Sequence, residues 1–217
     1  MKRTNSSARW LNEHFNDMYV KRAQQAGYRS RAAFKLLEIQ EKDRLLRPGM
    51  NVIDLGAAPG GWSIVAKKLV GETGRVFALD ILPIQAIFGV EFIQGDFNTD
   101  EVLNQLLSCI DNCPIDLVMS DMAPNTSGIS SVDQSRAMQL AEQALDFAKR
   151  ALKPNGTFIV KVFQGEGWQE FLQQMRAYFL QVKIRKPKAS RPRSNEVYVV
   201  GFSFHRGPGV IKSGLTP

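Results

Sequence analysis

Short apolar segments alternate with amphipathic ones from residue 51 to residue 204, and this alternation constrains the fold more than any other feature of the chain. Apolar strands separated by amphipathic helices predict a mainly parallel sheet with helices on both faces. We expect helices at 60–70, 99–110, 134–152 and 167–179, and strands at 51–56, 74–80, 89–96, 115–121, 156–163, 181–187 and 196–204.

The last two expected strands are joined only by the segment 188–195. A parallel connection needs a crossover of about a dozen residues or more, so the final strand should run antiparallel. The predicted fold is therefore α/β and Rossmann-like, with a seven-stranded, mostly parallel sheet whose last strand is antiparallel.

Three parts of the chain are distinguished by their patterns. Residues 1–48 are expected to form a basic helical extension, with helices at 7–27 and 30–46. Residues 49–205 carry the alternating pattern and should form the main domain. Residues 206–217 show neither pattern, and we expect a disordered tail.

Basic residues are concentrated at both ends of the chain. Residues 1–50 hold 11 Lys and Arg against 5 Asp and Glu, and residues 183–206 hold 7 against 1, whereas residues 51–182 hold 9 against 15. Either basic run alone is typical of solvated surface, but two runs around an acidic centre favour a bound polyanion. The candidates for contacts to RNA are Arg29, Arg31, Lys186, Arg191 and Arg193.

Several classes of protein are disfavoured. No apolar run reaches the ~18 residues of a membrane span, and the N-terminus lacks the apolar stretch of a secretory signal. Cys109 and Cys113 are the only cysteines, and His14 and His205 are distant from them in sequence. We therefore expect no metal site, no disulfide framework and a reduced, cytoplasmic protein.

A glycine-rich turn lies between the first expected strand and the helix that follows it. Its glycines are Gly56, Gly60 and Gly61, so the second glycine of the dinucleotide fingerprint G-x-G-x-x-G is missing. The turn alone is weak support for a ligand site, because many strand-to-helix connections are tight turns. A nicotinamide oxidoreductase is disfavoured by the missing glycine.

Four carboxylates lie at or near the carboxyl ends of expected parallel strands: Asp54, Asp80, Asp96 and Asp121. One such aspartate is often only a cap or turn residue. Four together make a poor site for a diphosphate but suit a ligand with hydroxyls, an amine and a positive centre. S-adenosylmethionine has all three groups, so the pattern favours this cofactor.

Lys161 interrupts an otherwise apolar strand, where a lysine is costly to bury. It lies near the carboxyl end of its strand, as Asp121 does in the preceding sheet strand. Glu196 begins the antiparallel final strand, whose start meets the same edge of the sheet. The three side chains are therefore expected to converge in a functional cluster, although a snorkelling lysine or a structural ion pair would also explain Lys161.

Five motifs, in this order along the chain, resemble those of the FtsJ-type ribose 2′-O-methyltransferases. They are "SRAAFKL", "VIDLGAAPGGW", "SDMAPNTSG", "VKVFQGEG" and "SRPRSNEVYVV". The resemblance implies an S-adenosylmethionine-dependent methyltransferase fold, a catalytic set of Lys35, Asp121, Lys161 and Glu196, and cofactor contacts at Gly60, Trp62, Asp80, Asp96 and Asp121. Gly56, in the glycine-rich turn, and Asp54, beside it, are also expected to contact the cofactor.

The resemblance further implies methylation of a uridine ribose in 23S ribosomal RNA, on the assembled large subunit, by a monomer that needs no protein partner. A ribose hydroxyl must lose its proton as it attacks the methyl group, and a lysine whose pKa is lowered can accept that proton. Our hypothesis is that Lys161 removes the proton while Lys35 and Asp121 position the hydroxyl. The alternative keeps Lys161 charged, so that it stabilises the developing oxyanion.

Other functions remain open on the sequence alone. A transfer RNA or messenger RNA cap is a possible substrate of the same chemistry. A methyltransferase of small molecules or proteins would leave the basic ends unexplained, and salt-dependent retention on heparin would favour RNA. A non-catalytic RNA-binding module would not need the four polar catalytic positions. Methylation of a base amine is disfavoured, because "DMAP" lacks the adjacent prolines and the aromatic residue that grip a planar amine.

Overall fold

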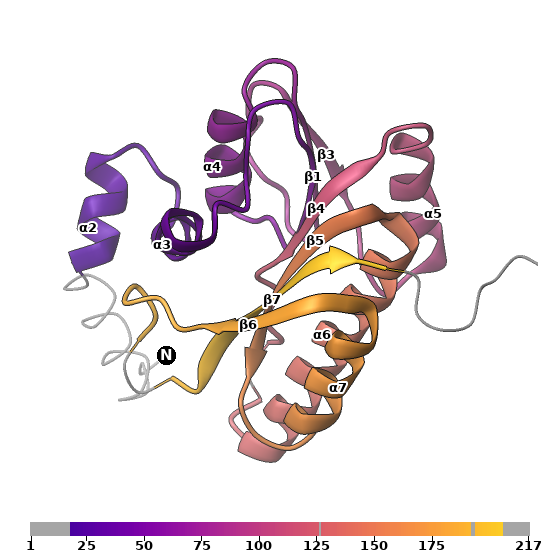
Figure 1. The fold of residues 1–217 in the computed structure, drawn as a ribbon. Coiled ribbons are helices and arrows are strands. Elements are labelled where there is room, and N and C mark those ends of the chain that lie inside the picture. The colour runs from indigo at the N-terminus through magenta and orange to yellow at the C-terminus, as the bar shows by residue number, and fades with distance from the viewer. Residues whose placement is uncertain (1–17, 126, 192–193, 206–217) are drawn as a thin grey trace, which may run out of the picture.

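The computed structural model describes residues 18–125, 127–191 and 194–205 (Figure 1). Its helices are α2 (Met18–Gln25), α3 (Ala32–Asp43), α4 (Gly61–Val70), α5 (Asp100–Cys109), α6 (Ser130–Ala151) and α7 (Trp168–Tyr178). Its strands are β1 (Asn51–Leu55), β2 (Arg75–Asp80), β3 (Val90–Gln94), β4 (Ile115–Ser120), β5 (Leu152–Phe163), β6 (Phe179–Arg185) and β7 (Glu196–Phe204). The beginning of the helix expected at 7–27 and the tail expected at 206–217 lie outside the described residues.

The seven strands form one sheet in the order β3-β2-β1-β4-β5-β7-β6. The pairs from β3 to β5 are parallel, and β7 runs antiparallel to both of its neighbours. The predicted α/β fold with an antiparallel last strand is thus confirmed. Because the order of the strands reverses at β1 and β4, their carboxyl ends open a crevice at the edge of the sheet.

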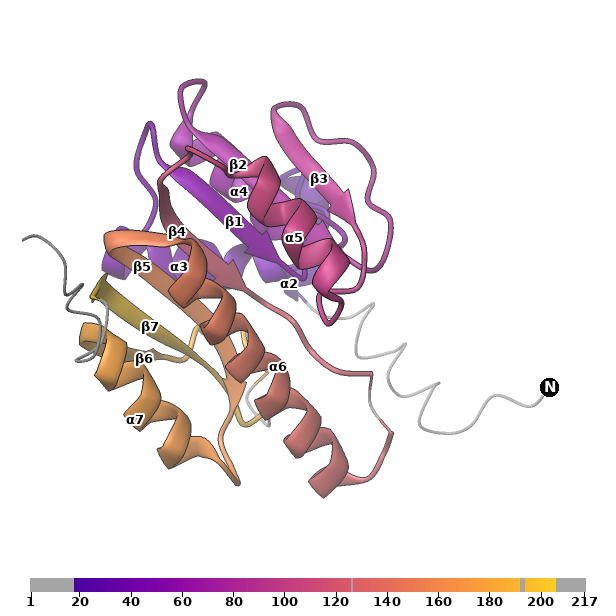
Figure 2. The same ribbon diagram turned by 90° about the vertical axis from the view of Figure 1, so that its right-hand side faces the viewer.

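Both faces of the sheet are buried, and successive residues of a strand point to opposite faces. In β1, Ile53 and Leu55 belong to the core beneath α5, α6 and α7, whereas Val52 belongs to the core shared with α3 and α4. Figure 2 shows α5, α6 and α7 together in front of the sheet, with α3 and α4 behind it. Helix α3 contributes Leu36 and Ile39 to the second core, so the described part of the N-terminal extension packs against the main domain. The division at residue 48 stays a prediction.

Two helix boundaries differ from those expected by three residues or more. Helix α6 begins at Ser130 instead of residue 134. The sequence did not reveal its first turn because the residues there are largely exposed and carry no apolar periodicity; the first buried residue is Ala137. Helix α3 ends at Asp43 because Arg44 adopts a left-handed conformation with φ 49°. The described residues contain no helix that is long and apolar enough to cross a bilayer.

Candidate active site

The turn after β1 brings the main chain against the loop that follows β4. Gly56 has φ +76°, and a Cβ atom there would lie 2.5 Å from the Cγ atom and 3.1 Å from the Cα atom of Met122. The amide of Gly56 donates a hydrogen bond to the carbonyl oxygen of Leu79 at the end of β2 (2.9 Å). Only a residue without a side chain permits this approach, which explains the glycine.

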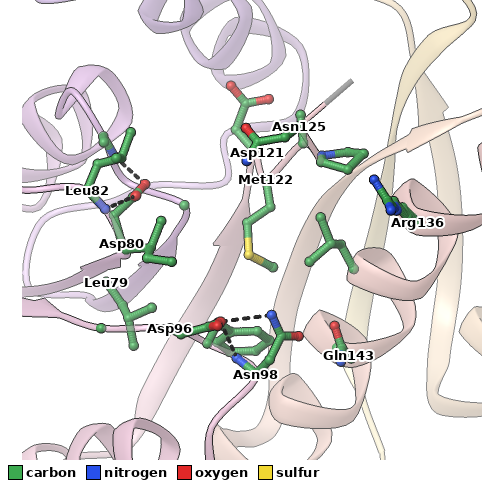
Figure 3. A pocket seen from close by; sticks show the side chains of 18 of the residues that line it. Leu79, Asp80, Leu82, Asp96, Asn98, Asp121, Met122, Asn125, Arg136 and Gln143 are labelled. Carbon is green, nitrogen blue, oxygen red and sulfur yellow. Dashed lines mark hydrogen bonds between the residues drawn. The ribbon is translucent and has the colours of Figure 1, made fainter. Parts of the chain in front are cut away.

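A pocket of about 640 Å³ opens at the carboxyl ends of β1, β2, β3 and β4, with α6 as its far wall (Figure 3). Gly56, Asp80, Asp96 and Asp121 line it, so four of the residues predicted to bind a cofactor meet in one cavity. The remaining lining residues are Ala58, Leu79, Ile81, Leu82, Gly95, Phe97, Asn98, Met122, Ala123, Pro124, Asn125, Arg136, Gln139, Leu140 and Gln143.

Two of the pocket's carboxylates also order the loops around it. Asp80 accepts hydrogen bonds from the amides of Ala58 and Leu82, at 2.8 Å each. Asp96 accepts from the main-chain and side-chain nitrogens of Asn98, at 2.9 and 2.8 Å (Figure 3). A carboxylate has about four acceptor sites, so these carboxylates keep capacity for the hydroxyl or amino groups of a ligand.

Gly60, Trp62 and Asp54 do not line the pocket. The buried indole of Trp62 donates to the carbonyl oxygen of Ala32 (2.8 Å), and its ring centroid lies 5.5 Å from that of Tyr198. A Cβ atom at Gly60 would lie 2.7 Å from the Cδ1 atom of Ile87. Trp62 therefore anchors α4 to the start of α3, and direct cofactor contacts at these positions stay predictions.

Asp54 is fully buried next to this turn. Its Oδ2 atom accepts a hydrogen bond from the hydroxyl of Ser63 (2.6 Å), while its Oδ1 atom is buried without a partner among the described residues. Burial raises the pKa of Asp54 to about 7, against the hydrogen bond from Ser63, and the carboxylates of Asp121 and Asp80 add to the rise. The group therefore titrates near neutral pH.

Lys161, Asp121 and Tyr198 meet at the edge of the sheet beside the pocket. The Lys161 ammonium donates to the main-chain oxygen of Asp121 at 2.5 Å and lies 3.0 Å from its Oδ1 atom. The Tyr198 hydroxyl donates to the same Oδ1 atom at 2.7 Å. Lys161 and Tyr198 are opposite each other in the β5–β7 register, so both reach Asp121 from one face of the sheet.

Lys35 and Glu196 complete the cluster. The Lys35 ammonium donates to the Oε1 atom of Glu196 at 2.5 Å and lies 5.6 Å from the ring centroid of Tyr198. The hydroxyl of Ser190 donates to the same Oε1 atom at 2.8 Å. The four residues of the predicted catalytic set therefore form one group around Tyr198, although they come from α3, β5, β7 and the end of β4.

Sequence reasoning missed Tyr198, although a signal for it existed. A residue two positions after Glu196 on the same strand points to the same face of the sheet. Tyr198 could therefore have been expected near the predicted catalytic residues.

The charges in the cluster stabilise one another. Burial would raise the pKa of Asp121, but the ammonium groups of Lys161 and Lys35 and the hydrogen bond from Tyr198 outweigh it, so the pKa lies below its usual value. Burial raises the pKa of Tyr198 well above its usual value, and the carboxylates of Asp121 and Glu196 raise it further. Asp121 is therefore an anion at neutral pH, and Tyr198 is a neutral hydrogen-bond donor.

The predicted RNA contacts occupy two loops beside the cluster. The Arg29 guanidinium donates to the carbonyl oxygens of Pro59, Gln85 and Ala86, at 3.3, 2.6 and 3.0 Å, and so links the glycine-rich turn to the loop after β2. Arg31 donates to the carbonyl oxygen of Ala189.

The other basic candidates lie between β6 and β7. Lys186 is exposed and donates to the carbonyl oxygen of Ser194 at 2.6 Å, and Arg191 is partly exposed. Arg193 lies outside the described residues. A role in RNA binding stays a prediction for all five basic residues.

The pocket also contains a buried hydrogen-bond acceptor that has no donor among the described residues. The Gln143 Oε1 atom, on the α6 wall, is buried without a partner in the described part of the chain (Figure 3). A buried amide oxygen without a hydrogen bond costs free energy, so a ligand with an N–H or O–H group would be favoured there. Together with the three carboxylates, it makes the pocket a set of acceptors for a ligand rich in hydroxyl and amino groups.

The comparison with known proteins agrees with this geometry. The family model described as FtsJ-like methyltransferase matches residues 28–204. The chain is 61% identical over 204 residues to "Ribosomal RNA large subunit methyltransferase E" of Cellvibrio japonicus, covering 94% of this chain and 97% of that protein.

A solved structure is also similar to this one. It is a ribosomal RNA methyltransferase from Plasmodium falciparum, with a TM-score of 0.73 and 27% identity, and the similarity covers 82% of this chain and 98% of that one. The family predicted from the five motifs is thereby confirmed, and with it the prediction of an enzyme that uses a methyl donor. The chain belongs to the FtsJ-like methyltransferase family.

Proposed function

We propose that this chain transfers a methyl group from S-adenosylmethionine to the ribose 2′-hydroxyl of a uridine in 23S ribosomal RNA. The substrate is the RNA within the assembled large subunit, which places the reaction in the cytoplasm, and the chain acts as a monomer. The relative from Cellvibrio japonicus, whose printed name is that of a large-subunit methyltransferase, supports the substrate class.

The observation that carries the proposal is the double role of Asp121. It lines the acidic pocket and also holds Lys161 and Tyr198. A hydroxyl bound beside Lys161 would therefore lie next to a methyl donor in the pocket. Alignment of attacking and transferred atoms is a large part of the rate enhancement of such a transfer.

The pocket suits S-adenosylmethionine, which would supply an electrophilic methyl group on a sulfonium. Asp80, at the end of β2 as in other nucleotide-binding sheets, would accept the two ribose hydroxyls of the cofactor. Asp96 and the unpartnered Gln143 Oε1 atom would accept amino hydrogens. Asp121 provides a negative charge for a positive centre.

In the proposed mechanism Lys161 acts as the neutral amine, formed when its ammonium group releases a proton to water, and this amine accepts the proton of the 2′-hydroxyl. Its side chain lies 3.0 Å from a carboxylate oxygen that is shared with Tyr198, so its direction is fixed before RNA binds. Lys35, held by Glu196, provides a second positive charge beside the developing oxyanion. The basic residues of the loop between β6 and β7 would bind RNA phosphates next to this cluster.

The test is a transfer assay with radiolabelled S-adenosylmethionine and large subunits that lack the modification, followed by mapping of the labelled nucleotide. We expect label on a single ribose of 23S RNA. Label on a base, on transfer RNA alone or on protein would overturn the proposal. Labelling of free 23S RNA as efficiently as of the subunit would overturn the choice of substrate particle.

A further inference from the structure

One face of α3 presents polar side chains to the loop between β6 and β7. Arg31, just before the helix, Lys35 and Glu38 are spaced four and three residues apart, which places them on the same side. Arg31 donates to the carbonyl oxygen of Ala189, and Lys35 pairs with Glu196 at the start of β7. Each of the first two therefore contacts the loop or the strand that follows it.

Glu38 contacts the loop through both oxygens of its carboxylate. Its Oε2 atom accepts a hydrogen bond from the amide of Lys188 at 2.6 Å, and its Oε1 atom accepts from the amide of Ala189 at 2.9 Å. Hydrogen bonds to an ionised acceptor are about twice as strong as neutral ones. One carboxylate thus holds two successive peptide groups of a segment 150 residues away in sequence.

The loop is arranged around this contact. Ala189 and Ser190 are buried, whereas Lys186 and Lys188 are exposed. Ser190 follows directly after the held peptides, and its hydroxyl donates to the Glu196 oxygen that pairs with Lys35. A shift of the main chain at 188–189 would therefore move a donor that orients the Glu196 carboxylate.

We propose that Glu38 is a positioning residue for the methyl transfer. It fixes the peptides at 188–189, so that Ser190 and Glu196 hold the Lys35 ammonium in place while Lys186 and Lys188 face the RNA. The same helix thus supplies Lys35 and fixes the loop that orients the partner of Lys35. This inference rests on the proposed function and deepens it.

The test compares Glu38→Gln and Glu38→Ala with Glu41→Gln, which removes an exposed carboxylate from the same helix. In Glu38→Gln one acceptor is replaced by an NH₂ group that faces a peptide N–H. Amide hydrogen exchange at Lys188 and Ala189, the dissociation constant of S-adenosylmethionine, kcat, and KM for large subunits are measured for each variant.

We expect exchange at these two amides to rise about tenfold or more in both Glu38 variants. We also expect kcat to fall about tenfold, because the positioning of Lys35 is lost, while the dissociation constant of S-adenosylmethionine changes less than about twofold. Glu41→Gln should match the wild type. If Glu38→Ala fails to fold, the isosteric Glu38→Gln variant still decides the question.

Two results would overturn the inference. Unchanged exchange at Lys188 and Ala189 would show that Glu38 does not hold the loop. Faster exchange with wild-type kcat and KM would show that the contact is only structural. An active wild-type enzyme with unaffected variants contradicts this inference alone, whereas a wild-type protein that cannot methylate large subunits contradicts the proposed function itself.

Discussion

The Lys161 side chain is positioned by contacts with two oxygens of Asp121. An arginine at this position would be longer and always charged, so it could neither keep these contacts unchanged nor accept a proton. We expect Lys161→Arg to lower kcat by roughly 10²–10⁴-fold at all pH values, the usual contribution of a general base. The pH dependence of kcat under single-turnover conditions checks this. Substantial retained activity would assign Lys161 to oxyanion stabilisation instead.

Asp54 gives the stability of the protein a pH dependence of definite sign. Its pKa is about 7 in the folded chain against 3.8 ordinarily, so the folded state binds the proton more tightly than the unfolded state. The free energy of unfolding contributed by this group is fully present below about pH 4 and is lost as the pH rises through about 7, with a slope approaching about 1.4 kcal/mol per pH unit.

Asp54→Asn removes this titration, so its stability should decline less between about pH 4 and pH 7 than that of the wild type. Urea denaturation across this range measures the difference. Asp100→Asn, at an exposed position in α5, serves as the control and should follow the wild type. Parallel pH profiles for Asp54→Asn and the wild type would contradict the raised pKa.

At the scale of elements, the turn between β1 and α4 depends on close approach as well as on backbone conformation. Gly56→Ala and Gly71→Ala both place a side chain at φ near +70°, but a Cβ atom at Gly71 meets nothing within 4 Å. We expect a cost of about 1–3 kcal/mol in the free energy of unfolding for Gly71→Ala, because its ψ of −163° lies in a region almost restricted to glycine, and a larger cost for Gly56→Ala.

Only Gly56→Ala should also weaken cofactor binding, since the pocket wall at Met122 must move. Thermal denaturation and calorimetric titration with S-adenosylmethionine distinguish the two effects. If both variants lost the same affinity for S-adenosylmethionine, backbone strain alone would explain the effect of Gly56→Ala, and the close approach to Met122 would not be needed.

The elements also show what the sequence could and could not predict. The alternation of apolar and amphipathic segments predicted the strands, and the short connection 188–195 predicted that β7 runs antiparallel. Both predictions were possible because they depend only on spacing along the chain. The hydrogen bonds of Arg29 and Glu38 were not predictable. Their partners are main-chain groups of distant loops, which any residue type provides and which therefore leave no pattern in the sequence.

The same distinction between local spacing and tertiary contacts explains which residues of the candidate site could be placed from the sequence. Asp80, Asp96 and Asp121 were placed correctly in the pocket because a strand end fixes where a residue lies. Cofactor contacts at Trp62 and Gly60 were expected from resemblance and stay predictions, since the orientation of a residue inside a turn depends on tertiary packing such as the bond from the Trp62 indole to Ala32.

At the scale of the whole molecule, the net charge of +7 is concentrated in the two terminal basic segments. If Arg191 contacts a phosphate, Arg191→Gln should reduce the slope of log K against log salt concentration by about 0.7–0.9. Binding of a 23S RNA fragment at several salt concentrations measures this slope.

Arg75→Gln is a matched control, because Arg75 begins β2 at the opposite edge of the sheet and pairs with Glu91. An equal change of slope in both variants would show a general charge effect and contradict a specific contact at Arg191.

The position of β7 has a consequence for the newly made protein. This strand is the last described element along the chain, yet it inserts between β5 and β6 and brings Glu196 and Tyr198 with it. A nascent polypeptide can assemble the pocket at the ends of β1 to β4 from elements made earlier, but the cluster of Lys35, Asp121, Lys161 and Glu196 forms only after β7 has left the ribosome and inserted into the sheet.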